Sequence, residues 1–93
     1  MALKTFEEFK VEKLRQGFDE VLVREWAPFF ENEPHTHPFD TDALIIDGEY
    51  WLSCDGVVTH LRSGDTFTLR RNKVHSERYG PKGCVFWAAR KNA

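Results

Sequence analysis

The feature that most constrains the fold is the dipeptide Asp55-Gly56, which separates two runs rich in β-branched and aromatic residues, 49–54 and 57–62. Both central positions of a two-residue type I′ turn need positive φ, and Asp-Gly is a favoured pair for these positions. The pattern therefore predicts a tight hairpin with an antiparallel strand on either side. The rest of the fold has to be built around an antiparallel sheet.

Similar short runs, each bounded by turn residues, occur along most of the remaining chain. We expect further strands at 20–26, 43–46, 66–69, 74–79 and 84–89. The segment 29–34 is expected to be a loop and the Gly- and Pro-containing segment 80–83 a turn. About eight short strands with closely spaced turn signals are typical of an all-β sandwich or small barrel.

The beginning of the chain predicts one short helix at about residues 5–16. Thr5 and Glu8 have the spacing of a capping box, in which each side chain bonds the backbone N–H of the other residue. An apolar stripe at helical spacing follows, and Gly17 suits the end of the helix. We expect this helix to cover an open end of the sheet.

Composition limits the classes of protein to which the chain can belong. With 93 residues, of which 41% are hydrophobic and 14% aromatic, residues 1–93 suit one compact domain and are too few for two cores. A net charge of −2 gives no basic surface for nucleic acid. No apolar run approaches the length of a membrane span, and acidic Glu7 and Glu8 precede any hydrophobic signal region, so we expect a cytoplasmic protein. Cys54 and Cys84 are then expected to be reduced.

Three histidines form a candidate metal site. His35 and His37 are separated by one residue, and side chains at i and i+2 of an extended strand point to the same face. His75 is the third candidate if the fold brings it against this pair. Neutral imidazole binds zinc, iron, nickel and copper, whereas an added carboxylate favours iron or manganese. The expected cofactor is one divalent transition metal from this group, and His60 is expected to lie on the surface.

The spacing of these residues resembles the motifs of the cupins, a family with a double-stranded β-helix or jelly-roll barrel. The first cupin motif contains a His-x-His pair, a Glu and a Gly, and His35, His37 and Gly48 match it. The second motif begins with Gly and continues to a His, matched by Gly64 and His75. The resemblance implies an all-β jelly roll in which the three matched histidines bind the metal.

The resemblance covers about residues 20–90 and departs from the family pattern at several positions. Thr41 stands at the place of the usual glutamate ligand, and Arg70, Asn72 and Tyr79 replace the Pro, Gly and Asn of the second motif. Cupins of this size are stand-alone domains, and the resemblance implies a homodimer, which would also cover open sheet edges. Because cupins include oxygenases, isomerases and sugar-sensing domains, the family implies no single activity.

Several other side chains are candidates for the site. Asp42 or Glu77 could be a fourth ligand or a base: Asp42 if its strand begins one residue off register, and Glu77 because it shares strand parity with His75. The expected ligand-binding residues are Trp51, Arg78, Tyr79 and Trp87, with Phe67 and Phe86 also in the lining and Arg70 and Arg71 as further anchors for an anionic group.

Two functions remain open at this point. As an enzyme, the protein would use its metal to polarise a bound small molecule or, with iron, to activate dioxygen, as oxygenases and isomerases do. As a binding or sensing module, it would hold a small sugar or carboxylic acid without turnover. Both functions require a small polar or anionic ligand beside the three histidines.

Overall fold

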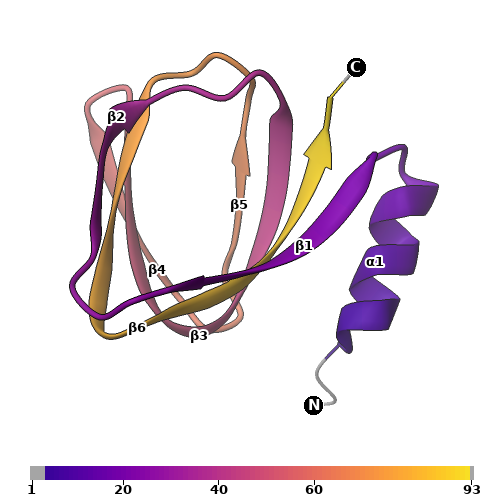
Figure 1. Ribbon diagram of the computed structural model, residues 1–93, viewed down its shortest axis with the longest axis horizontal. Coiled ribbons are helices and arrows are strands. Elements are labelled where there is room, and N and C mark those ends of the chain that lie inside the picture. Colours follow the sequence, from indigo (N-terminus) through magenta and orange to yellow (C-terminus); the bar gives the residue numbers. More distant parts are fainter. Residues whose placement is uncertain (1–3, 93) are drawn as a thin grey trace.

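The computed structural model describes residues 4–92, which form one short helix and six strands arranged as a barrel (Figure 1). The elements are α1 Phe6–Arg15, β1 Glu20–Trp26, β2 Glu31–His35, β3 Asp40–Cys54, β4 Val57–Arg62, β5 Thr66–Leu69 and β6 His75–Lys91. Every strand pairing is antiparallel. The predicted all-β jelly roll with a short N-terminal helix is confirmed. Within the described residues, no helix is long and apolar enough to cross a membrane.

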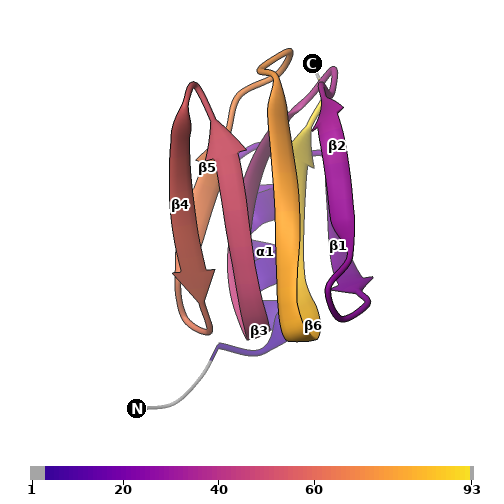
Figure 2. The ribbon, with the colours of Figure 1, turned by 90° about the vertical axis from the view of Figure 1, so that its left-hand side faces the viewer.

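The two long strands β3 and β6 belong to both halves of the barrel. They contain 15 and 17 residues and pair with each other along most of their length. One half of the barrel is the sheet β1-β6-β3-β5, and the other is β2-β6-β3-β4. Figure 2 shows β4, β3, β6 and β2 side by side in this second half. The space between the two halves is the interior of the barrel.

The structure differs from the expected strand limits at the place where the long strands bend. The strands expected at 43–46 and 49–54 are one strand, β3, and the turn expected at 80–83 is a bend inside β6. Gly48 and Gly83 explain the bend: both have positive φ, at 84° and 72°, and a Cβ on Gly48 would collide with the backbone of Gly83. Only glycine allows the two backbones to approach this closely.

The bend also changes which residues of β3 face inward. Register shifts in the β3–β6 pairing lie on both sides of Asp47: the shift between Ile45 and Asp47 adds a residue to β3, and the shift between Gly48 and Tyr50 adds residues to β6. Ala43 and Ile45 are buried before the shifts, and Tyr50 and Leu52 are buried after them. The inward positions therefore change from odd to even residue numbers, and β6 changes parity in the same way.

The predicted Asp55-Gly56 hairpin is confirmed. The two residues have φ values of 54° and 76°, as a type I′ turn requires, and Cys54 pairs with Val57 across it. Residues 31–35, in contrast, form the strand β2, although residues 31–34 lie in the segment expected to be a loop. Its polar residues and Pro34 have low β propensity, so its pairing with β6 is a tertiary effect.

The N-terminal helix begins with the predicted capping box. The Glu8 backbone N–H donates to Thr5 Oγ1, and the Thr5 N–H donates to Glu8 Oε1, each at 3.1 Å. Phe9 of α1 is buried in a cluster that includes Trp87, whose ring centroid lies 5.6 Å from that of Phe9. The helix therefore covers the outer face of the β1-β6-β3 sheet, beside β1 (Figure 1), rather than an open end of the sheet.

Candidate metal and ligand site

The end of β2 and the start of β6 bring the three predicted metal-binding histidines together. His35 ends β2 and is paired with His75, which begins β6, while His37 lies in the connection from β2 to β3. One ligand nitrogen from each ring can be chosen so that all three lie within 4.8 Å of one another. This spacing slightly exceeds twice a zinc–nitrogen bond of about 2.1 Å, so small side-chain movements would let one ion contact all three rings.

Backbone carbonyl groups orient two of the three rings. His35 Nδ1 lies 2.6 Å from the carbonyl oxygen of Glu33, and His75 Nδ1 lies 2.9 Å from that of Lys73. A carbonyl oxygen only accepts hydrogen bonds, so each Nδ1 carries the hydrogen. In the neutral form of each ring, Nε2 then has a free lone pair, which is the arrangement that metal-binding histidines use.

Glu77 lies beside these two lone pairs. Its Oε1 is 3.2 Å from His75 Nε2 and 3.5 Å from His35 Nε2, and its side chain is only 8% exposed. Three groups that accept hydrogen bonds thus meet without a donor between them when the imidazoles are neutral. The other oxygen, Oε2, is buried without a partner among residues 4–92. A divalent transition metal bound here would accept the lone pairs of these groups, because imidazole and carboxylate are its usual ligands.

His37 is also suited to bind a metal ion as a neutral imidazole. Its pKa is lowered to about 4, and the largest cause is burial, which disfavours the charged ring. The positive charges that His35 and His75 carry when protonated are the next cause, and the guanidinium groups of Arg90 and Arg24 add smaller effects. His37 therefore keeps a free lone pair at neutral pH.

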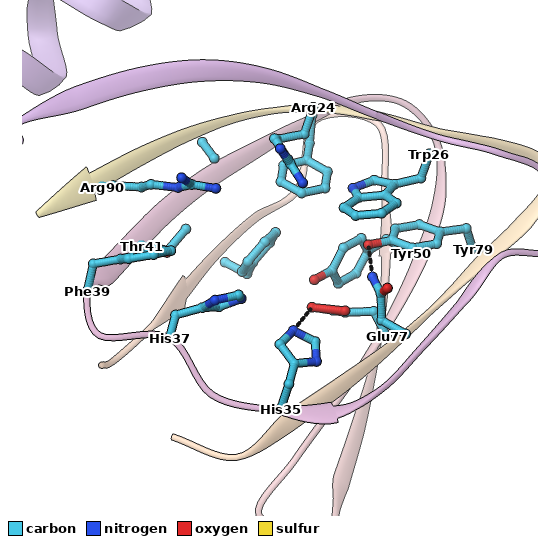
Figure 3. A pocket seen from close by; sticks show the side chains of 14 residues that line it. Arg24, Trp26, His35, His37, Phe39, Thr41, Tyr50, Glu77, Tyr79 and Arg90 are labelled. Atoms are coloured by element: carbon cyan, nitrogen blue, oxygen red, sulfur yellow. Dashed lines mark hydrogen bonds and ion pairs between the residues drawn. The ribbon is translucent and has the colours of Figure 1, made fainter. Parts of the chain in front are cut away.

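His35, His37 and Glu77 face a cavity of about 270 Å³ inside the barrel (Figure 3). The apolar and aromatic part of its wall consists of Phe39, Tyr50, Phe67, Tyr79, Phe86 and Ala88. Polar groups reach the same space from Arg24, Trp26, Asn32, Thr41 and Arg90. The cavity thus joins a group of metal-ligating side chains to a mainly aromatic chamber with a few polar groups, as small-molecule sites do.

The two acidic candidates lie on opposite faces of the barrel wall. Glu77 points inward, as its parity with His75 predicts. Asp42 points outward, where its carboxylate contacts Lys13 Nζ at 3.2 Å and accepts from Thr68 Oγ1 at 3.0 Å. Thr41 lines the cavity at the usual glutamate position but has no carboxylate to offer. The carboxylate beside the histidines therefore comes from β6 and not from β3.

Two of the four expected ligand-binding residues lie on the outer face of the barrel. Trp51 stacks on His60, with ring centroids 4.3 Å apart, and the guanidinium carbon of Arg78 lies 4.7 Å from the centre of the Trp51 ring. Neither Trp51 nor Arg78 reaches the cavity, in contrast to the expectation. Trp51 has the same parity as Thr41, and the register shifts between them turn it outward.

Of the remaining candidates, Tyr79 lines the cavity and Trp87 does not. Trp87 packs against the helix, with its ring centroid 5.5 Å from that of Phe6. Phe67 and Phe86 line the cavity as expected. The expected anchors Arg70 and Arg71 are absent from its lining, and Arg71 forms an ion pair with Asp40 at 3.1 Å.

Sequence reasoning did not identify two arginines that reach the cavity. Arg24 and Trp26 occupy alternate positions of the strand predicted at 20–26, and Arg90 follows the inward parity of Phe86 in β6. Both patterns are visible in the sequence, and the alternation of side chains along a strand would have grouped these residues. Asn32 gave no such signal because its segment was expected to be a loop.

Comparisons with known proteins agree with the fold and identify a family. Residues 18–89 match the sequence profile of the family described as AraC-like ligand binding domain. A search of curated proteins finds no match.

Solved structures similar to this chain include several cupins. An RmlC-like cupin from Shewanella frigidimarina is 24% identical, with a TM-score of 0.66 over 80% of this chain and 68% of the other. An uncharacterized conserved protein with a double-stranded β-helix domain from Klebsiella pneumoniae is 31% identical, with a TM-score of 0.65 over 77% and 65%. KdgF from Halomonas sp. is 17% identical, with a TM-score of 0.66 over 78% and 68%. The chain thus spans about two thirds of the length of these proteins.

Proposed function

We propose, from the premise that this chain belongs to the family of AraC-like ligand binding domains, that its barrel holds one divalent transition metal and binds a small polar or anionic molecule beside it. The observation that carries this proposal is the convergence of Nε2 of His35 and of His75 on Oε1 of Glu77, with no donor among them. His37, with its lowered pKa, would complete a set of three imidazoles and one carboxylate. Zinc, iron, manganese, nickel and copper all accept such ligands.

The cavity residues support the binding of a small molecule. The ligand would lie against the aromatic wall, which includes Phe67 and Phe86, and beside the histidines. Burial of apolar surface would contribute affinity, and the polar groups would fix the orientation. In this proposal the protein acts first as a binding module, which agrees with the description of its family.

Metal loading of the wild-type protein tests this function. The protein is treated with EDTA, dialysed, and exposed separately to each of the five ions, and its metal content is measured by inductively coupled plasma mass spectrometry. We expect one ion per chain for at least one metal, with stabilisation of about 2.7 kcal/mol at a hundredfold excess over Kd and reversal by chelator. Failure of all five ions to bind in a one-to-one ratio would contradict the proposal.

A second candidate function is metal-dependent catalysis, and the position of Glu77 favours it. Its Oε2 is buried in the cavity wall without a partner among residues 4–92, so it could accept a proton from a bound ligand. The metal, when bound, would polarise an oxygen atom of that ligand. Exchange of deuterium into candidate acids, and oxygen uptake with them, would detect turnover. The absence of both with a ligand that binds would assign the site to binding alone.

The proposed functional unit is one domain over residues 1–93 that pairs as a homodimer. Strands β1, β2, β4 and β5 are at the edges of the two halves of the barrel, and pairing would cover some of their unpaired backbone groups. Light scattering after size-exclusion chromatography would give twice the chain mass of 10.9 kDa for a dimer. A monomer at micromolar concentration would remove this part of the proposal and leave the metal site unaffected.

A further inference from the structure

Two arginines enter the cavity from the side opposite the histidines. Arg24 comes from β1 and Arg90 from the end of β6. Figure 3 shows both guanidinium groups directed into the cavity, with His35 and His37 on its other side. The two guanidinium groups give this end of the cavity a positive charge, so the arrangement favours an anionic ligand.

Neither guanidinium group is fully neutralised by the protein. Arg24 stacks on Trp26, with its guanidinium carbon 5.0 Å from the ring centroid, and forms no ion pair within residues 4–92. Arg90 lies 4.5 Å from the ring centroid of Phe39 and contacts Glu20 at 3.3 Å. The Glu20 side chain is 45% exposed, and such surface ion pairs contribute little. The aromatic rings therefore hold the two guanidinium groups in place and leave hydrogen-bond donors free for a ligand.

The indole of Trp26 adds a third donor to the same wall. Its Nε1 is buried and has no hydrogen-bond partner among residues 4–92. In Figure 3 this ring lies at the cavity, next to Arg24. An indole N–H can only donate, and leaving a buried donor unpaired is costly. A ligand oxygen would satisfy this donor after a small movement of the ring, because the nitrogen itself is closed to solvent.

The size and middle section of the cavity limit the rest of the ligand. Its volume of about 270 Å³ is just below the usual range of about 300–1,000 Å³ for small-molecule pockets, which indicates a molecule of metabolite size. Phe67, Phe86 and Ala88 form its apolar wall. A short carbon chain suits this wall, with oxygen atoms at its two ends.

We propose that the cavity binds a short aliphatic dicarboxylic or hydroxycarboxylic acid, with one carboxylate held by Arg24, Arg90 and Trp26. The oxygen atoms at the other end of the acid are directed toward the histidines and Glu77. Guanidinium groups bind carboxylates through paired, charge-assisted hydrogen bonds, which gives both affinity and orientation. The placement of one end of the ligand beside the histidines depends on the proposed function. The placement of its carboxylate beside the two arginines depends on the geometry of β1 and β6.

Three five-carbon probes test the proposal: glutarate, 5-hydroxypentanoate and the neutral 1,5-pentanediol. Calorimetric titrations are made with the metal-free and the metal-loaded protein. We expect both acids to bind at least about tenfold more tightly than the diol, because a charged hydrogen-bonding pair contributes at least this factor. Arg24→Gln and Arg90→Gln should each raise the Kd for 5-hydroxypentanoate at least about tenfold, and metal content should stay at the wild-type value.

Arg78→Gln is the matched control, because Arg78 also stacks on a tryptophan ring but lies on the outer face of the barrel. It should change the Kd less than twofold. Arg24→Lys keeps the charge without the planar fork and should show a smaller loss than Arg24→Gln, so it tests the contact if the Gln variant does not fold. Melting temperatures without ligand identify variants that are merely unstable.

The outcomes separate this inference from the proposed function. Acids that bind no better than the diol, or Arg24→Gln and Arg90→Gln variants that bind 5-hydroxypentanoate as the wild type does, would overturn it. Inorganic phosphate that binds more tightly than both acids would overturn the assignment to carboxylates. If the protein takes up no metal and 5-hydroxypentanoate still depends on both arginines, the proposed metal function fails and the carboxylate site stands.

Discussion

The outer and inner faces of the barrel wall carry almost the same types of side chain, but these side chains make different hydrogen bonds. On the outer face, Trp51 stacks on His60 and is contacted by Arg78, and His60 Nε2 lies 2.6 Å from a carboxylate oxygen of Glu49. The same residue types occur on the inner face, as Trp26, Arg24, His35, His37, His75 and Glu77. Residue type alone therefore does not distinguish a functional site from an ordinary surface.

The difference between the faces lies in the hydrogen bonds that each group makes. His60 has partners for both nitrogens, since its Nδ1 also lies 3.4 Å from a guanidinium nitrogen of Arg62. On the inner face, two lone pairs meet the carboxylate of Glu77, and among residues 4–92 Glu77 Oε2 and Trp26 Nε1 have no partner. Buried polar groups without partners are rare in folded proteins, so they mark places where a ligand, an ion or an ordered water binds.

The largest expected effect comes from breaking the bend that assigns residues to the two faces. In Gly48→Ala, the new Cβ would meet the backbone of Gly83, and we expect a loss of about 3 kcal/mol or more in the free energy of unfolding. Urea unfolding followed by circular dichroism measures this loss. Gly64→Ala is the control, because Gly64 also has positive φ but open space around it, and it should cost about 1 kcal/mol. Equal losses would show that close approach of the backbones does not hold the bend.

The next effect concerns the two glutamates that lie beside histidines. Glu77→Gln removes the charge from the inner carboxylate, and we expect metal affinity to fall at least about tenfold, as when a ligand or its supporting group is lost. Glu49→Gln makes the same change on the outer face and should leave metal affinity within about twofold of the wild type. Competition with a chromophoric chelator measures both values. Equal effects of the two substitutions would place Glu77 outside the metal site.

The smallest expected effect is that of the outer histidine. His60→Ala removes a partly exposed ring and its contact with Glu49, so the free energy of unfolding should change by no more than about 1 kcal/mol. Thermal unfolding with and without metal should show the same metal-dependent shift as the wild type. A reduced shift would mean that the outer group is coupled to metal binding, and the comparison between the faces would lose its basis.

Much of this fold could be predicted from local sequence signals. The Asp55-Gly56 turn and the helix cap at Thr5 depend only on residues close in sequence, so their patterns were sufficient. The approach of His75 to the His35 and His37 pair required only that two motif-bearing segments become neighbours. The position of Glu77 followed from its parity with His75, because no bulge separates them.

The side chains around the cavity were harder to assign because β3 and β6 change parity at their bend. Trp51 shares the parity of Thr41, and Trp87 shares that of His75, so uninterrupted strands would have turned both tryptophans inward. The bulge depends on the approach of Gly48 to Gly83, which are far apart in sequence. A one-residue shift in a strand reverses the face of every side chain that follows.

X-ray absorption spectroscopy of the metal-loaded protein tests the central claim most directly. The claim predicts scattering from three imidazole rings and one carboxylate oxygen at about 2.0–2.2 Å from the metal. His75→Ala should lose one imidazole contribution or all bound metal, and His60→Ala should leave the spectrum unchanged. A shell of sulfur atoms at about 2.3 Å, or a wild-type spectrum without imidazole scattering, would contradict the claim.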